Sequence, residues 1–486
     1  MNKLIVLVQP SHGLWDSLFC RLPESILSVA AVPHAKGYNI KIVDQRIHPD
    51  WKNRLKRLID QQPICIGLTA LTGPSLGNAL EIAAFIKQYN PKTQVVLGGV
   101  HATILPEQTI ENANIDIVVK GEGDYTFFNL VQALESHSPL ENIKGLYLRK
   151  DGRKVFTGEA QMIEDLDALA DTPYELVEMD KYSAVDLGTG KSVSFQTARG
   201  CPFACRFCAN ELLQKRRWRA MSNSHLVKKI KMLQDGYRYS TFCFLDDCTS
   251  ANIEHLRAIL KAFIELENKI TWTTFGIRAD LIAKLDYSDI DLLWKSGCRA
   301  LDIGIESGSD RVLRYLAKNE TKDAMRLANK KLARYPIQLK YTFLIGLPTE
   351  SDEELNESLD FYLQLADENP NAFPMVFTYT PIAGTSLYED LALHGFMGPT
   401  KAEDWVHMDS KSWLHYYPAW IAPRKRKKLE TIMISSLFCN KKGSYKLTTP
   451  FSKLAFLLYH PLAKFRFKHK FFAFPIEAFL VRNFLK

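Results

Sequence analysis

The sequence predicts an α/β protein with two successive blocks of strands and helices, followed by a helical, basic C-terminal region. Short apolar runs alternate with helical patterns in residues 1–145 and again in 191–384. Alternation of this kind is typical of parallel sheets with crossover helices. The 486 residues are also too many for one ordinary domain. We expect residues 146–190 to form a linker and residues 385–486 to form the C-terminal region.

The first block is predicted to form a buried parallel sheet. Its strands are nearly continuous in Val, Ile and Leu, as expected for strands covered on both faces. The predicted strands are 4–8, 39–43, 64–68, 94–97 and 115–119. Ligands of such sheets bind beyond the carboxyl ends of the strands. Three loops at those ends supply the candidate binding residues, which are Thr69, Thr72, Gly98, Gly99, His101, Gly121 and Glu122.

The linker breaks this alternation. Residues 147–155 carry Asp151 and Gly152 between two short extended stretches, which predicts a β-hairpin. Acidic residues crowd the positions that follow, from Glu164 to Asp180. A charge run of this kind is typical of a solvated face, so we assign it no chemistry.

The second block contains six strand and helix repeats, fewer than the eight of a closed barrel. The predicted strands are 192–197, 241–245, 271–276, 300–305, 339–345 and 375–379. In barrel-like sheets, the groups that act on a ligand lie at the carboxyl ends of the strands. Asp246 and Asp247 follow the second strand, and Arg278 follows the third. These side chains could contact a ligand, or serve as a helix cap and a surface arginine.

The first strand of this block leads into a loop with three closely spaced cysteines, Cys201, Cys205 and Cys208. Three thiolates can hold three corners of an iron–sulfur cube and leave one iron open, whereas a closed ferredoxin site needs four. A structural zinc site would also need a fourth ligand, and none is evident nearby. An incidental cysteine-rich loop is the remaining alternative, but intracellular chains seldom cluster cysteines without metal or redox use.

The cysteine loop resembles the signature of the radical S-adenosylmethionine (SAM) enzymes, CxxxCxxC with an aromatic residue before the last cysteine, here Phe207. The resemblance implies that Cys201, Cys205 and Cys208 hold a 4Fe-4S cluster whose open iron binds SAM. Electron transfer from the cluster would then cleave SAM to a 5′-deoxyadenosyl radical. The resemblance also implies a partial, TIM-like (β/α)6 barrel and an electron donor such as flavodoxin or ferredoxin.

Two later segments extend this resemblance. The fourth strand ends in Gly-Ile-Glu-Ser-Gly, which is similar to the family's GIESG segment, so Glu306 and Ser307 are expected to contact SAM. Gly346 and Pro348 follow the fifth strand in a segment similar to the family's xxGxPxE, which flanks the adenine. The second segment could also be a simple strand-to-helix turn with Glu350 in the first helical turn, where the helix dipole favours an acid.

The first block resembles the Rossmann-like cobalamin-binding domain that precedes the barrel in one large branch of this superfamily. Residues 98–103, Gly-Gly-Val-His-Ala-Thr, are similar to its GGxHxT loop, and residues 120–124, Lys-Gly-Glu-Gly-Asp, to its RGEGE-like loop. The resemblance implies cobalamin contacts from the seven candidate residues of these strand-end loops. The DxHxxG segment that places a histidine on cobalt in methionine synthase is absent, because residues 44–48 do not match it. His101 could also be a loop histidine hydrogen-bonded to the backbone.

The net charge of +8 comes from the C-terminal region. Residues 421–486 contain 15 Lys and Arg but two Asp and Glu, so the remainder is acidic overall and nucleic acid is not an expected partner. Basic residues alternate with bulky apolar ones in 451–486, which suits peripheral contact with an anionic membrane face. Packing on the barrel and a nucleic-acid patch are the alternatives.

Cysteine usage and hydropathy indicate the compartment. The nine cysteines form no regular framework, which favours a reducing environment. No apolar run reaches the roughly 18 residues of a spanning helix. We therefore expect a cytoplasmic protein whose tail contacts the inner membrane face.

Together these features predict a radical SAM enzyme that uses cobalamin to methylate an unactivated carbon of an organic substrate. The substrate is expected to be hydrophobic (lipid, isoprenoid or tetrapyrrole-like) or a secondary metabolite. The alternatives are a radical SAM cyclase or carbon–carbon coupling enzyme without methyl transfer, and a noncatalytic membrane-associated Fe-S protein. A transfer-RNA methylthiotransferase is disfavoured, since it needs three further N-terminal cysteines and only Cys20 and Cys65 precede Cys201.

Overall fold

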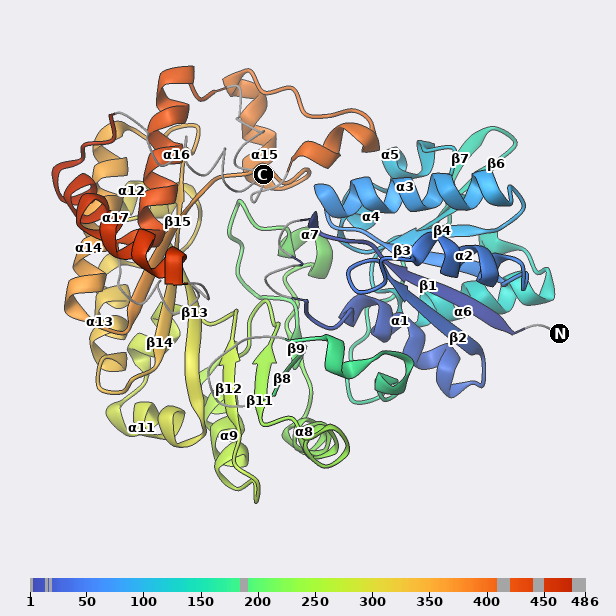
Figure 1. The fold of residues 1–486 in the computed structure, drawn as a ribbon, viewed down its shortest axis with the longest axis horizontal. Coiled ribbons are helices and arrows are strands. Elements are labelled where there is room, and N and C mark those ends of the chain that lie inside the picture. The colour runs from blue at the N-terminus through green and yellow to red at the C-terminus, as the bar shows by residue number, and fades with distance from the viewer. Residues whose placement is uncertain are drawn as a thin grey trace.

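The computed structural model describes residues 3–13, 16, 20–183, 191–408, 420–439 and 450–473. In this part of the chain, two α/β units lie side by side, with the N-terminal sheet on the right of Figure 1 and the second sheet on the left. A C-terminal segment, orange in Figure 1, runs along the top from the second unit toward α3 (Pro74–Tyr89). The predicted fold class is confirmed.

The N-terminal sheet has seven strands in the order β2-β1-β3-β4-β5-β6-β7. The strands are β1 (Leu4–Gln9), β2 (Asn39–Asp44), β3 (Cys65–Thr69), β4 (Val95–Gly98), β5 (Ile117–Val119), β6 (Leu146–Lys150) and β7 (Arg153–Phe156). The first five are parallel, whereas β6 pairs antiparallel with β5 and with β7. The hairpin that the sequence placed in the linker therefore extends this sheet, which runs to Phe156 and not to residue 145.

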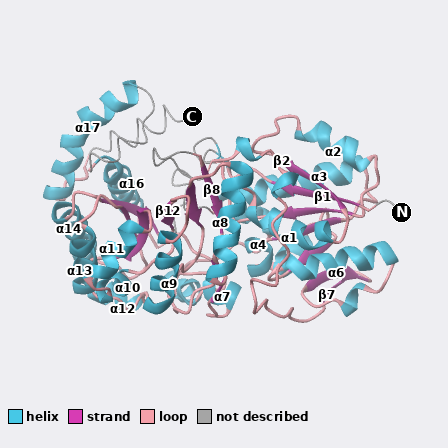
Figure 2. Ribbon diagram, turned by 90° about the horizontal axis from the view of Figure 1, so that it is seen from below, coloured by secondary structure: helices cyan, strands magenta, loops and turns pink. Residues whose placement is uncertain are grey.

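Helices cover both faces of the N-terminal sheet, which explains its unbroken apolar strands. Side chains of β1 alternate between two buried clusters, with Leu4 and Val6 in one and Ile5 and Leu7 in the other. One face carries α1 (Glu24–Ala35) and α6 (Gly123–Ser136). The other carries α2 (Trp51–Ile59), α3, α4 (Val100–Ile104) and α5 (Pro106–Glu111). Figure 2 shows the helices in cyan around the magenta strands.

The second sheet has six parallel strands in the order β15-β14-β13-β12-β11-β8, and so forms the predicted partial barrel. The strands are β8 (Ser192–Phe195), β11 (Thr241–Phe244), β12 (Thr271–Thr274), β13 (Cys298–Glu306), β14 (Gln338–Ile345) and β15 (Ala372–Thr378). The main helices between them are α8 (Asn223–Tyr237), α9 (Ile253–Ile264), α10 (Ala279–Lys284), α11 (Tyr287–Lys295), α12 (Asp310–Tyr315), α13 (Lys322–Leu332) and α14 (Asp352–Glu368). Aromatic side chains fill much of the core, including Phe195, Phe244 and Trp272.

The C-terminal region packs on both units. Helix α16 (Pro423–Phe438) lies against β15, and α17 (Pro450–His469) lies against α14 and α16. Trp405 is buried and donates its indole N–H to Gln108 of the N-terminal unit at 2.8 Å. Other aromatic residues of the predicted aromatic-rich segment, Trp413, Tyr416 and Tyr417, fall outside the described residues. None of the described helices is both long and apolar enough to cross a membrane.

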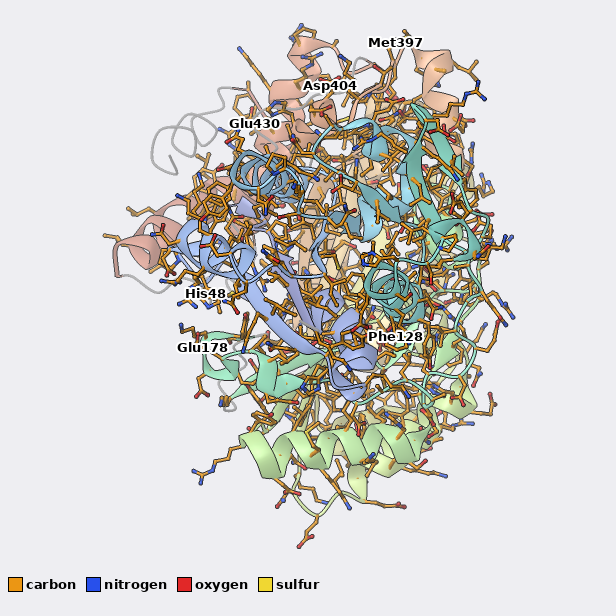
Figure 3. All side chains as sticks on the ribbon, turned by 90° about the vertical axis from the view of Figure 1, so that its right-hand side faces the viewer. His48, Phe128, Glu178, Met397, Asp404 and Glu430 are labelled. Carbon is orange, nitrogen blue, oxygen red and sulfur yellow. The ribbon has the colours of Figure 1, made fainter. Side chains whose placement is uncertain are left out.

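The connector between the two units also contributes to their contact. Tyr182 donates its hydroxyl to the buried Asp44 carboxylate at 2.9 Å. Nearby, Glu178 of the connector lies 3.5 Å from the ring of His48, in the turn that follows the N-terminal unit's second strand (Figure 3). The connector is therefore a packed part of the seam between the units.

A candidate cofactor site between the two domains

A cavity of about 770 Å³ lies between the two sheets. One wall is the carboxyl edge of the N-terminal sheet, and the other comes from the barrel, including Gln196, Arg199, Leu245, Asp247 and Phe275. Six of the seven strand-end residues predicted to bind cobalamin line the first wall, namely Thr69, Thr72, Gly98, Gly99, Gly121 and Glu122. The topology therefore brings three separate loops of the sequence to one concave surface.

The glycine loops allow the backbone to form this surface. Gly99 has a φ of +90°, and a Cβ there would lie 2.6 Å from Thr69 Oγ1 and 3.0 Å from the backbone of Ala70. Only glycine fits this close approach between the loops after β3 and β4. Gly121 has a φ of +88°, and a Cβ there would have no other atom within 4 Å, so this loop leaves open space toward the cavity. Both glycines therefore leave backbone on the wall of the cavity.

His101, the seventh predicted residue, does not line the cavity. Its side chain is fully buried, its Nδ1 lies 3.0 Å from the Thr72 hydroxyl, and its ring meets Trp405 edge-on at 6.3 Å. Burial lowers its pKa to about 4, so the ring is neutral near pH 7. The hydrogen-bond partner of the ring is thus the Thr72 side chain and not the backbone partner considered as the alternative.

The acidic loop after β5 pairs with arginines of the barrel, which the sequence did not predict. Arg199 donates two 2.9 Å hydrogen bonds to Asp124 and lies 3.4 Å from Glu122. Arg219 donates to Glu122 at 2.9 and 3.0 Å. Arg199 belongs to the short strand β9 (Ala198–Arg199) and stands two residues before Cys201. A buried ion-pair cluster thus ties the N-terminal domain directly to the cysteine loop.

The attraction between Asp124 and Arg199 outweighs the effect of burial on their pKa values. Burial would raise the pKa of Asp124, but the Arg199 guanidinium and the Ser28 hydroxyl lower it below its ordinary value. Burial likewise works against the charge of Arg199, and the two carboxylates raise its pKa instead. Asp124 and Arg199 are therefore both charged at neutral pH, and each has a partner of opposite charge.

The cysteine loop is held in place at several points. Gly200 has a φ of +84°, and a Cβ there would lie 2.0 Å from the carbonyl oxygen of Arg217, so no other residue fits. Arg206 anchors the middle of the loop, because its backbone N–H donates to Leu316 at 3.0 Å and its guanidinium pairs with Asp390. Phe207 packs against a buried apolar cluster to which the N-terminal sheet, the barrel and the C-terminal segment all contribute.

The three cysteines predicted to bind the cluster lie within one short loop. Within the described residues, no set of three His, Cys, Asp or Glu side chains is arranged to hold a metal ion. The neighbouring Cys248 thiol and the backbone of Phe203 lower the pKa of Cys201 to about 7. Burial raises the pKa of Cys208 to about 12, with smaller contributions from Cys205 and Cys201. A 4Fe-4S cluster takes one thiolate at each of three different irons, and all three cysteines are partly accessible.

Glu306 and Ser307 occupy a distorted strand end. A bulge in the pairing of β13 with β14 precedes Glu306, whose φ is +67°, an unusual value for a residue with a side chain. The buried Lys318 ammonium lies 3.5 Å from the Glu306 carboxylate and 3.2 Å from Glu320. Ser307 is buried and shares a 3.0 Å hydrogen bond with Ser358. These side chains are fixed by packing and ion pairs, and both Lys318 and Glu306 lie close enough to Cys205 to influence its pKa.

Gly346 and Pro348 form the turn after β14. Gly346 has a φ of +77°, its N–H donates to Glu350 at 2.7 Å, and its carbonyl accepts from the Trp420 indole at 2.9 Å. Burial raises the pKa of Glu350 to about 7. The strand-to-helix turn considered from the sequence is therefore present. The residues predicted to contact SAM do not line the 770 Å³ cavity.

The remaining charged side chains at the strand ends have different roles, some structural and one in the cavity wall. Asp246 is buried and accepts hydrogen bonds from Thr197 and Ala198, so it fixes the start of the cysteine loop. Asp247 lines the cavity. Arg278 pairs with Asp280 at 3.0 Å and stacks 3.7 Å from the Phe203 ring inside the cysteine loop.

Comparisons with known proteins decide the family. Residues 195–362 match the model of the Radical SAM superfamily, and residues 22–131 match that of the B12 binding domain. An uncharacterized methyltransferase of Pyrococcus horikoshii, PH0819, is 30% identical over 391 residues, which cover 80% of this chain and 83% of the relative. The chain belongs to the cobalamin-dependent radical SAM enzymes.

Other members of this family differ in reaction. The cytidylyl-2-hydroxyethylphosphonate methyltransferase of Streptomyces wedmorensis is 24% identical, with 82% of this chain and 83% of that protein covered. The anaerobic magnesium-protoporphyrin IX monomethyl ester cyclase of Rubrivivax gelatinosus is 26% identical, with 76% and 66% covered. Among solved structures, OxsB with aqua-cobalamin is similar in fold, with a TM-score of 0.76, 18% identity, and 96% of this chain and 72% of that chain covered.

The family fixes the cofactors of this radical SAM enzyme as a 4Fe-4S cluster, SAM and cobalamin. This confirms the cofactors predicted from the sequence. The residues present fit these groups, since the cavity is bounded by exposed backbone on one side and adjoins the loop of three cysteines on the other.

Proposed function

We propose that this chain is a methyltransferase that methylates an unactivated carbon of a bulky hydrophobic substrate of the lipid, isoprenoid or tetrapyrrole class, or of a secondary metabolite. The observation that carries the proposal is the shared cavity. Its walls combine the strand-end loops of a B12-type sheet with Arg199, two residues from the first cluster cysteine. When bound, the cluster and SAM supply a primary carbon radical and the corrinoid supplies a methyl group.

The chain's own residues bind and orient these groups. Cys201, Cys205 and Cys208 are proposed to ligate the cluster. Phe207, Glu306, Ser307, Gly346 and Pro348 are proposed to contact SAM. A carbon radical abstracts hydrogen from almost any C–H bond, so the site must hold one substrate hydrogen close and exclude solvent. The rigid packing around Ser307 and Gly346 suits that task better than a set of titratable groups would.

The cobalamin contacts are proposed to be Thr69, Thr72, Gly98, Gly99, Gly121 and Glu122. The glycines let backbone approach the ligand, and the threonine hydroxyls offer hydrogen bonds to its polar side groups. Glu122 is held by Arg219 and Arg199, so we propose that these ion pairs fix its position in the wall that contacts the ligand. A flavodoxin or ferredoxin is the proposed electron donor.

A second candidate is ring formation or carbon–carbon coupling without methyl transfer. The relatives include a cyclase as well as methyltransferases, and the cyclase supports this second candidate. Anaerobic turnover with reductant and candidate substrates separates the two. Methyl transfer predicts S-adenosylhomocysteine and 5′-deoxyadenosine in equal amounts, with isotope from methyl-labelled SAM in the product. Formation of 5′-deoxyadenosine with unlabelled product would support the second candidate, and no SAM cleavage with an intact cluster would contradict both.

We also propose that α17 rests on an anionic bilayer. Its inner face is buried, with Phe467 packed 4.7 Å from the Tyr362 ring, whereas its outer face exposes five large apolar side chains. They are Leu454, Leu457, Leu458, Leu462 and Phe465. The exposed Lys464 and Lys468 lie on the same helix. An exposed apolar stripe bordered by lysines is complementary to anionic lipid rather than to another apolar protein surface.

Vesicle flotation tests this contact. The full-length protein is expected to float with phosphatidylglycerol-containing vesicles, less so at high salt, and little with pure phosphatidylcholine. Leu458→Glu should reduce flotation, because Leu458 is 74% exposed on the outer face. Leu393→Glu is the matched control, since Leu393 is 84% exposed on a different element. Equal flotation of both variants, or none by the wild type, would contradict the proposal, and self-association in place of flotation would favour a second copy as the occupant.

A further inference from the structure

The cysteine loop closes on itself at its base. A Cβ added to Gly200, just before the first cysteine, would lie 2.0 Å from the carbonyl oxygen of Arg217 and 3.0 Å from the Cβ of Gln214. Beside this contact, Arg199 of β9 pairs antiparallel with Arg219 of β10 (Arg219–Ala220). The chain therefore leaves and re-enters one small region, and the three cysteines lie on the loop between these two crossings.

Two arginines at this base bind the acidic loop that follows β5. Arg199 donates to the two carboxylate oxygens of Asp124, both at 2.9 Å. Arg219 donates to the two oxygens of Glu122, at 2.9 and 3.0 Å. Arg219 also donates to the side chain of Gln214, at the end of the short helix that follows the third cysteine. The ion pairs thus hold the cysteine loop from both of its sides.

The same ion pairs belong to the wall of the 770 Å³ cavity. Glu122 and Asp124 line the cavity from the N-terminal sheet, and Arg199 and Gln214 line it from the barrel. The side chains of the four ion-paired residues are between 4% and 14% exposed. Bidentate arginine–carboxylate pairs fix orientation as well as contributing energy. One buried unit therefore joins the wall of the corrinoid cavity to the base of the loop that carries the cluster cysteines.

We propose that Arg199 and Arg219 are positioning residues that fix the separation between the corrinoid and the 4Fe-4S cluster. The two cofactors belong to different domains, and domains of one chain move relative to each other unless their interface prevents it. The reaction requires one substrate carbon to lie within reach of both cofactor sites, so a small displacement is costly. The arginines act through the acidic loop and the cysteine loop. This inference rests on corrinoid binding in the cavity, as the proposed function does.

Electron paramagnetic resonance of the reduced protein measures this separation without a substrate. The reduced cluster and the cob(II) form of cobalamin each have the net spin of one unpaired electron, and their dipolar coupling falls with the third power of the distance between them. The protein is loaded anaerobically with iron, sulfide and hydroxocobalamin and is then reduced with dithionite. Iron and corrinoid contents are measured on the same samples. The wild type is expected to show a single, well-defined coupling.

Variants assign the constraint to the arginines. Arg199→Gln and Arg219→Gln are expected to retain iron and corrinoid but to lose the single coupling, which spreads over a range of values. Arg257→Gln is the matched control and is expected to keep the wild-type coupling. Arg257 makes a bidentate pair with Asp289 at 2.6 and 2.7 Å, but both residues belong to the barrel, so this pair does not join the two domains.

The outcomes separate this inference from the proposed function. A broad or absent coupling in a wild type that holds both cofactors would overturn the inference and leave the proposed function intact. So would a wild-type coupling in both arginine variants. If Arg199→Gln loses a cofactor, Arg219→Gln decides, because it leaves the pair of Asp124 and Arg199 in place. Failure of the wild type to take up corrinoid would overturn both the inference and the proposed function.

Discussion

The ion pair between Asp124 and Arg199 should hold the two domains together. The side chains are 4% and 14% exposed and share two hydrogen bonds of 2.9 Å. Charge-assisted hydrogen bonds contribute about 1.5–3 kcal/mol each, and removing one partner of a buried pair typically costs about 3–5 kcal/mol. Asp124→Asn keeps the shape but removes the charged partner, and the guanidinium keeps a 3.4 Å contact to Glu122 and a 3.1 Å hydrogen bond to Ser28. We expect this variant to lose about 3–5 kcal/mol of unfolding free energy.

Urea denaturation followed by tryptophan fluorescence measures this loss. The matched control is Glu111→Gln, which removes an exposed ion pair with Lys154 on the same domain and should leave the midpoint unchanged. Asp124→Asn combined with Arg199→Met should cost less than the sum of the single changes, since no buried charge is then left alone. A midpoint for Asp124→Asn equal to that of the control would refute the reasoning.

The pH dependence of this pair has a defined sign. The pKa of Asp124 is lower in the folded protein than its ordinary value of 3.8. The pair therefore stabilises the fold at pH values above 3.8, and its contribution is lost as pH falls through the lower folded pKa. The difference between wild type and Asp124→Asn should accordingly be constant from about pH 6 to 8 and shrink in acid.

Three further variants test other parts of the structure. Gly200→Ala should abolish iron loading, because the added Cβ would lie 2.0 Å from a carbonyl oxygen. The control Gly152→Ala places its Cβ in open space and should load iron normally. Equal iron contents of the two variants would contradict this prediction. Glu350→Gln should stabilise the protein at about pH 8 but not at about pH 4.5. The wild-type carboxyl has a pKa of about 7, so folding becomes less favourable as pH rises from 4.5 to 7. A difference in urea midpoints that does not depend on pH would argue against this prediction. Trp405→Ala should cost about 3–5 kcal/mol through loss of a buried indole, and an unchanged melting temperature would rule out its packing role.

Periodicity and loop chemistry were sufficient to predict the strands and the three strand-end loops of one cavity wall. Each of the five N-terminal and six barrel strands expected from the sequence is present. The loops after β3, β4 and β5 meet because parallel strands end at a common edge. The position of β6 was not predictable in this way, since nothing local to 146–150 indicates pairing with β5 rather than with a separate hairpin.

Long-range partners account for the remaining differences. Arg199 lies 75 residues from Asp124, and no sequence pattern links the two. The loop glycines could be recognised from the sequence, but the orientation of the His101 ring could not. The ring packs against Trp405, which lies more than 300 residues later in the chain.

The central claim is that the cavity between the domains holds the corrinoid. Ser25 lines this cavity at the start of α1, where its side chain is exposed, so Ser25→Trp fills the space without disturbing the core. Corrinoid and iron are measured per chain after anaerobic loading with hydroxocobalamin. We predict that wild type and Ser25→Ala bind one corrinoid per chain, and that Ser25→Trp loses it while retaining its iron. Full corrinoid binding by Ser25→Trp, or none by the wild type, would contradict the account.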